Sequence, residues 1–127
     1  MQEDLPPELV REYIDASLDK LTRMDECLRC LDESGRETFL SLAHKLKGTG
    51  GVYGLAVVSD IATRLDDAVR LVRDGELTLT PALLEALSLG VTVLREVFEQ
   101  ASSGSVTLTA DHRFFGEMDR VARPGPG

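Results

Sequence analysis

The residues best suited to chemistry lie in one short segment, Ala43-His44-Lys45-Leu46-Lys47-Gly48. At about 100° per residue, the apolar residues of the surrounding helical pattern fall roughly opposite His44, so the imidazole is expected to face solvent. Lys47 lies about 60° from His44 on the same face, within reach of an anion held at the ring. Gly48 leaves the helix surface beside the ring bare, at a cost of roughly 1 kcal/mol relative to alanine. The pattern predicts an exposed nucleophile that a second protein can approach.

A neutral imidazole is a nucleophile near pH 7, and it can accept a phosphoryl group. Lys47, at about 5 Å, would stabilise the added negative charge by on the order of 1 to 3 kcal/mol. The sequence has no Gly-rich nucleotide loop and no kinase signature set. It therefore predicts a phosphotransfer carrier that is not itself an enzyme and needs no cofactor, with magnesium expected on the partner only. A solvated surface histidine without a role is the competing interpretation.

The two cysteines have the C-x-x-C spacing of a redox pair, but they lie inside a helical pattern with no preceding strand. Cys27 and Cys30 are therefore interpreted as reduced thiols. The acidic residues form no clear cluster, and His44 and His112 are the only histidines, so no metal site is predicted.

Apolar residues at helical spacing predict four amphipathic helices, with no strand pattern before residue 104. The first covers about 7–31, and the second starts at Ser34, where Ser34 and Glu37 have the S-x-x-E spacing of a capping box. The third covers 55–72, and the fourth begins at Pro81 after the capping residue Thr80. The predicted fold class is all-α, an antiparallel four-helix bundle over residues 5–102, in which Gly90 marks close helix packing. Residues 103–127 are expected to form a C-terminal tail with a short extra helix near 110–121, docked through Phe114 and Phe115.

Charge and hydropathy narrow the choice of partner. The chain has 127 residues, 22 acidic and 14 basic, with a net charge of −8. This balance argues against general binding to nucleic acid or to an anionic membrane surface, and it favours proteins as partners. No apolar run approaches the roughly 18 residues of a membrane span, and no secretory signal is apparent. A cytoplasmic monomer is the expectation.

The segment from Ala43 to Leu55 resembles the motif of the histidine-containing phosphotransfer (HPt) domain family. That motif is A-H-x-L-K-G followed, after five residues, by a glycine and an apolar residue, and the resemblance covers residues 5–102. It implies that His44 is the phosphoacceptor, exchanging a phosphoryl group with the aspartate of a response-regulator receiver domain in a two-component phosphorelay. It also implies that Lys47 stabilises the phosphohistidine, and that Gly48 clears space for the receiver. Gly54 matches the glycine at the start of the next helix, and the candidate receiver contacts on or beside the exposed face are Leu40, Ser41 and Lys45.

Two alternatives stay open. The first is the phosphoacceptor domain of a chemotaxis-type histidine kinase, in which an ATP-bound kinase domain is the donor. The second is a non-catalytic adaptor bundle in which His44 stays unmodified. The dimerising domain of an ordinary sensor kinase fits less well, because there an acidic residue and a Thr-Pro pair follow the histidine, whereas Lys45, Leu46, Lys47 and Gly48 stand here.

Overall fold

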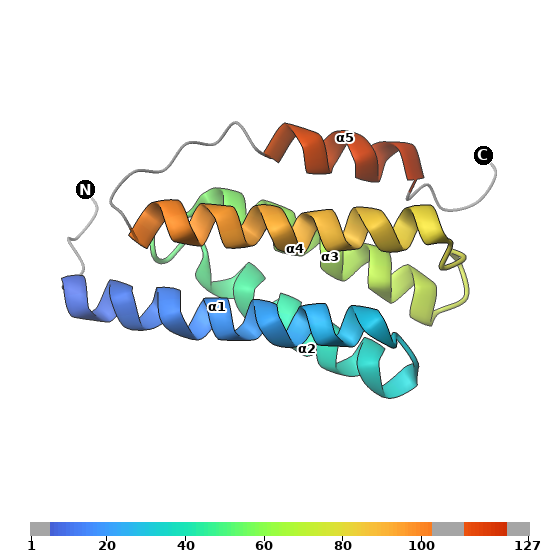
Figure 1. Cartoon of the computed structure of the whole chain (residues 1–127), viewed down its shortest axis with the longest axis horizontal. Coiled ribbons are helices and arrows are strands. Elements are labelled where there is room, and N and C mark those ends of the chain that lie inside the picture. Colours follow the sequence, from blue (N-terminus) through green and yellow to red (C-terminus); the bar gives the residue numbers. More distant parts are fainter. Residues whose placement is uncertain (1–5, 103–110, 122–127) are drawn as a thin grey trace.

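The computed structural model describes residues 6–102 and 111–121, and these ranges hold five α-helices and no strand (Figure 1). The predicted all-α fold class is confirmed. The remaining parts of the predicted tail, 103–110 and 122–127, lie outside the described residues. The helices are α1 (Pro7–Arg29), α2 (Glu33–Thr49), α3 (Ala56–Arg73), α4 (Pro81–Ser102) and α5 (Asp111–Val121).

The first four helices form the predicted antiparallel bundle. α1 packs against α2 and α4, and α3 packs against the same two helices, so the four form a closed ring (Figure 1). Short connections between successive helices make neighbours antiparallel. The core inside the ring consists of the inward apolar stripe of each helix and includes the fully buried Leu21, Phe39, Leu65 and Leu94.

The capping residue of α2 differs from the prediction. Asp32 takes an extended backbone conformation, and its Oδ1 accepts a hydrogen bond of 2.8 Å from the backbone N–H of Gly35. The predicted capping box of Ser34 and Glu37 is therefore wrong, because Ser34 already lies inside the first turn, where its own conformation is helical. The predicted cap of α4 is confirmed, since Oγ1 of Thr80 accepts from the N–H of Leu83 at 3.1 Å.

The fifth helix docks on the bundle through apolar side chains. α5 lies along α4 and also contacts α3, on the side of α4 away from α1 (Figure 1). Phe114 and Met118 are buried, with exposed fractions of 0% and 1%. A Cβ atom at Gly90 would lie 2.6 Å from Cε1 of Phe114 and 2.8 Å from Cδ2 of Leu65. The predictions of close packing at Gly90 and of docking through Phe114 are confirmed.

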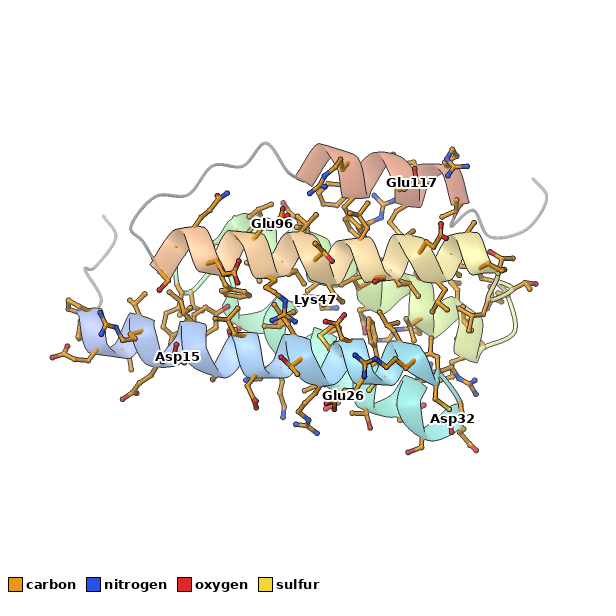
Figure 2. The ribbon with its side chains drawn as sticks, viewed as in Figure 1. Asp15, Glu26, Asp32, Lys47, Glu96 and Glu117 are labelled. Atoms are coloured by element: carbon orange, nitrogen blue, oxygen red, sulfur yellow. The ribbon has the colours of Figure 1, made fainter. Side chains whose placement is uncertain are left out.

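Charged side chains hold the rim of this contact. The guanidinium of Arg64 lies 5.5 Å from the ring centroid of the half-buried Phe115, and it pairs with Asp119 at 2.6 Å. Arg113 pairs with Glu96 at 3.1 Å across α5 and α4, and Figure 2 shows Glu96 on the side of α4 that faces α5. Such exposed pairs contribute little individually, so the buried apolar residues dominate the docking energy.

Candidate functional site

His44 projects from α2 into solvent. The side chain is exposed, whereas Phe39 and Leu46 on the opposite side of the helix are 0% and 1% exposed. The predicted orientation of the imidazole is therefore confirmed. Within the described parts of the chain, the exposed His44 side chain makes no hydrogen bond or ion pair, so no other side chain engages its ring nitrogens.

The surface beside His44 is nearly as predicted. Ser41, Lys45 and Gly48 are exposed, and a Cβ atom at Gly48 would have no neighbouring atom within 4 Å. The expectation that Leu40 lies on or beside the exposed face is wrong, because its side chain is 6% exposed and belongs to the hydrophobic core. Leu40 precedes Lys47 by two helical turns and so lies on the same side of α2, the side that packs on α3.

The hydroxyl of Ser59, from α3, fixes the end of α2 next to the site. Its Oγ donates a hydrogen bond of 2.9 Å to the carbonyl oxygen of Lys47 and accepts one of 3.2 Å from the N–H of Gly51. A Cβ atom at Gly50 would lie 2.7 Å from this hydroxyl oxygen, so only glycine permits the close approach. No specific feature of the sequence indicates this role of Ser59, since a single serine in a helix has many uses.

Gly54 has a conformational reason to be glycine. Its φ is +78°, a left-handed conformation that other residues rarely adopt, and it lies two residues before the first residue of α3. The residue allows the chain to turn from the end of α2 into α3. Its predicted contact with a partner remains a prediction.

An aromatic pair ties the turn after α2 to α1. The rings of Tyr13 and Tyr53 stack with centroids 3.9 Å apart and planes 2° from parallel. Oγ1 of Thr49, the last residue of α2, donates to the hydroxyl of Tyr13 at 3.3 Å. Burial raises the pKa of Tyr13 above its ordinary value of 10.0. These contacts hold the glycine-rich turn in one place relative to α1.

Lys47 is paired with a buried carboxylate, Asp66, that is not among the predicted site residues. Its Nζ lies 3.5 Å from Oδ2 of Asp66 in α3, and the exposed fractions of the two side chains are 34% and 1%. Nη2 of Arg70 donates to both oxygens of Asp66, at 3.0 and 2.8 Å. The hydrogen bond and the charge of Asp66 raise the pKa of Arg70. In Figure 2, Lys47 lies toward the middle of the long axis of the bundle, away from both of its ends.

Two signals in the sequence pointed to Asp66. It falls between Leu65 and Ala68 in the apolar stripe of α3, where a charged residue needs partners, and Arg70 follows it at the i, i+4 spacing of a helix ion pair. The contact with Lys47 depends on how α2 and α3 are placed, which the spacing alone does not determine.

Neither a metal centre nor a membrane span is found among residues 6–102 and 111–121. No three side chains of His, Cys, Asp or Glu come together there as a metal ion would require. No helix in these ranges is both long enough and apolar enough to cross a bilayer.

Comparison with known proteins decides the family. Residues 8–104 match the model of the Hpt domain. The chain belongs to the Hpt domain family. Among solved structures, this Hpt domain resembles the phosphorylated P1 domain of CheA3 in complex with CheY6 from R. sphaeroides, with a TM-score of 0.82 and 25% sequence identity. The match covers 93% of this chain and 98% of that chain. Among curated proteins, no sequence relative matches.

Membership of the Hpt family places the chain in phosphotransfer within two-component signalling. The predicted family and the helical-bundle fold are therefore confirmed. The motif from Ala43 to Leu55, which carried the prediction, lies within the matched residues.

Proposed function

We propose that His44 is the phosphoacceptor of this Hpt domain, taking a phosphoryl group from the aspartate of a response-regulator receiver domain and returning it to such an aspartate. The observation that carries the proposal is the exposed imidazole on α2. It lies in the segment that resembles the motif of the Hpt family, within the residues that match the family model. The similar P1 domain is phosphorylated and bound to CheY6, a CheY-type receiver, which supports the same class of partner here.

The transfer exchanges one bond for another. A ring nitrogen of His44 attacks the phosphorus of the receiver's aspartyl phosphate, so an N–P bond forms while the O–P bond breaks. The electron pair of the broken bond returns to the receiver as a free carboxylate, and the reverse step regenerates the neutral imidazole. The chain brings an exposed ring and a nearby cation, and the magnesium that phosphoryl transfer uses would come with the receiver.

The neighbours of His44 would have separate roles in this transfer. Lys47 would stabilise the charge on the phosphohistidine, and the bare surface at Gly48 would let the receiver approach the ring. Ser41 and Lys45 are exposed on the same helix and would contact the receiver directly. Leu40, being buried, would support this surface from below.

A second candidate function has one specific observation in its favour. Helices α1 to α4 occupy residues 7–102, about three quarters of the chain, whereas the match to the P1 domain of CheA3 covers 93% of it. The similarity therefore reaches beyond the bundle into the region of α5. This similarity favours the alternative that the chain is the phosphoacceptor domain of a chemotaxis-type histidine kinase, as the P1 domain of CheA3 is. In that case an ATP-bound kinase domain would phosphorylate His44 of this chain.

A transfer assay separates these functions. The wild-type chain and the variant His44→Gln would be incubated with a panel of phosphorylated receiver domains, and separately with ATP and a chemotaxis-type kinase domain. Acid-labile phosphate on the wild type alone, taken from a receiver, would support the phosphorelay carrier. Label only from the kinase domain would support the second candidate. No label from either donor would contradict both and leave the adaptor, and label on the variant would contradict the assignment of His44.

A further inference from the structure

We propose that Asp66 is a positioning residue that competes with the phosphohistidine for the ammonium group of Lys47, and so sets how long the phosphoryl group stays on His44. This inference rests on the proposed role of His44 as phosphoacceptor. It adds a group on α3 to a site whose motif ends at Leu55, before α3 begins.

The starting point is the burial of Asp66. Its side chain is 1% exposed, and a carboxylate removed from water is strongly unfavourable unless cations or hydrogen-bond donors compensate it. Two cations do so here, Lys47 at 3.5 Å and Arg70 at 2.8 Å from the same oxygen, Oδ2. Because the Lys47 ammonium lies against Asp66, it is engaged before any phosphate arrives.

The two cations are bound unequally. Arg70 donates to both carboxylate oxygens at hydrogen-bonding distances, whereas the Lys47 contact is an ion pair at 3.5 Å. If Lys47 leaves, Asp66 keeps its charge-assisted hydrogen bonds to Arg70 and is not left as an uncompensated buried charge. Arg70 therefore makes the release of Lys47 energetically accessible.

Phosphorylation supplies the reason for release. A phosphoryl group adds roughly −1.5 to −2 charges and three strong acceptor oxygens. Lys47 is one helical turn from His44, its side chain is one-third exposed, and its flexible four-carbon stem allows the ammonium to move between anions. The ammonium would then divide its time between Asp66 and the phosphohistidine, and whatever strengthens one contact weakens the other.

The test uses two variants that change the competition in opposite directions. Asp66→Asn removes the competing charge, so the phosphohistidine half-life after removal of the donor should lengthen about threefold. Arg70→Gln leaves Asp66 with Lys47 alone, so the lysine should be held more firmly and the half-life should shorten by a similar factor. Asp67→Asn, a neighbouring exposed carboxylate, is the matched control and should leave the half-life unchanged.

The same substitutions in a Lys47→Met background separate competition from structural damage. There, neither Asp66→Asn nor Arg70→Gln should alter the half-life, because the lysine that transmits the effect is gone. Effects that persist without Lys47, or that have the same sign in both single variants, would overturn the proposal. If Asp66→Asn fails to fold, Arg70→Gln decides alone, since an unchanged half-life would overturn the proposal and a shorter one would support it.

A wild type that takes no phosphate on His44 would overturn both this inference and the proposed function, whereas normal labelling with unchanged half-lives would overturn this inference only.

Discussion

Gly90 in α4 and Phe114 in α5 approach so closely that a single Cβ atom at Gly90 would lie 2.6 Å from Cε1 of the Phe114 ring. Because Gly90 has no side chain, the ring of Phe114, the main anchor of α5, can pack directly against α4. The docking of the fifth helix thus depends on one glycine of the bundle.

Gly90→Ala should therefore destabilise the protein. Alanine gains roughly 1 kcal/mol of helix propensity, but overpacking against Phe114 and Leu65 costs typically 1 to 3 kcal/mol, so a net loss of about 1 kcal/mol is expected. Urea unfolding would measure the change. The matched control is Gly116→Ala on the exposed face of α5, where a Cβ atom meets nothing within 4 Å, and which should be neutral or stabilising. Equal stabilisation by both substitutions would contradict the close packing at Gly90.

Features of the fold that depend on residues close together in the sequence could be predicted, whereas features that depend on contacts between helices could be predicted only in part. Thr80 and Pro81 are local signals, and the cap of α4 was predicted correctly from them. The cap of α2 was misassigned because Asp32 and Ser34 are both good capping residues, and only the extended backbone at Asp32 selects between them. Gly90 was recognised as a packing position, but Met118 as a second anchor of α5 was not, because a methionine in a short helix has no distinctive pattern.

The same distinction between local signals and contacts between helices applies to the candidate site. The exposure of His44 follows from helical periodicity within α2, so the sequence was sufficient. Leu40 was misplaced because periodicity locates it beside His44 but does not say how far α3 covers that side of α2. Asp66 was missed for the same reason, since its contact with Lys47 joins two helices. Contacts between elements depend on packing, which single-helix patterns do not contain.

Gly48 gives a prediction in which stability and function change in opposite directions. Gly48→Gln should leave the protein at least as stable as the wild type, because glycine is unfavourable in a helix and no atom lies within 4 Å of the new Cβ position. Transfer from a receiver should nevertheless slow by about tenfold or more, since the longer side chain occupies the approach to His44.

Phosphorylation by a small donor such as phosphoramidate supplies the control for this variant. A small molecule needs no flat surface, so its reaction with Gly48→Gln should proceed at nearly the wild-type rate. Equal slowing with both donors would show that the substitution damages the imidazole environment instead of the docking surface.

Lys47 should affect the phosphohistidine itself. Lys47→Ala is expected to slow transfer by about tenfold and to shorten the phosphohistidine half-life, because one stabilising charge of about 1.4 kcal/mol is lost. The half-life is measured on the isolated phosphorylated chain by loss of acid-labile phosphate. Lys45→Ala is the control, since Lys45 is proposed to contact only the receiver and should leave that half-life unchanged. If the two alanine variants behave alike, Lys47 has no special relation to the phosphate.

The burial of Tyr13 predicts how the stability of the protein changes at alkaline pH. Burial raises the pKa of Tyr13 above 10.0, so the folded state holds the phenolic proton at pH values where the unfolded chain releases it. The free energy of unfolding should therefore be insensitive to this group below about pH 9 and should fall as the pH rises above 10.0.

Denaturant unfolding of wild type and Tyr13→Phe at about pH 8 and pH 11 would measure this contribution. At the lower pH the variant should be less stable than the wild type by about 1 kcal/mol, because phenylalanine lacks the hydroxyl that accepts the hydrogen bond from Thr49. As the pH rises, the free energy of unfolding of the variant should fall less steeply than that of the wild type. Parallel declines in the two proteins would show that Tyr13 does not contribute to the alkaline loss of stability.

The central claim is that His44 carries the phosphoryl group, and locating the phosphate tests it most directly. The chain would be phosphorylated by a receiver or kinase donor, digested at neutral to alkaline pH to preserve the N–P bond, and its peptides analysed by mass spectrometry. A single acid-labile phosphate on His44, absent from a correctly folded His44→Gln variant, is the predicted result. Phosphate on any other residue of the wild type, or undiminished phosphate on the variant, would contradict the account.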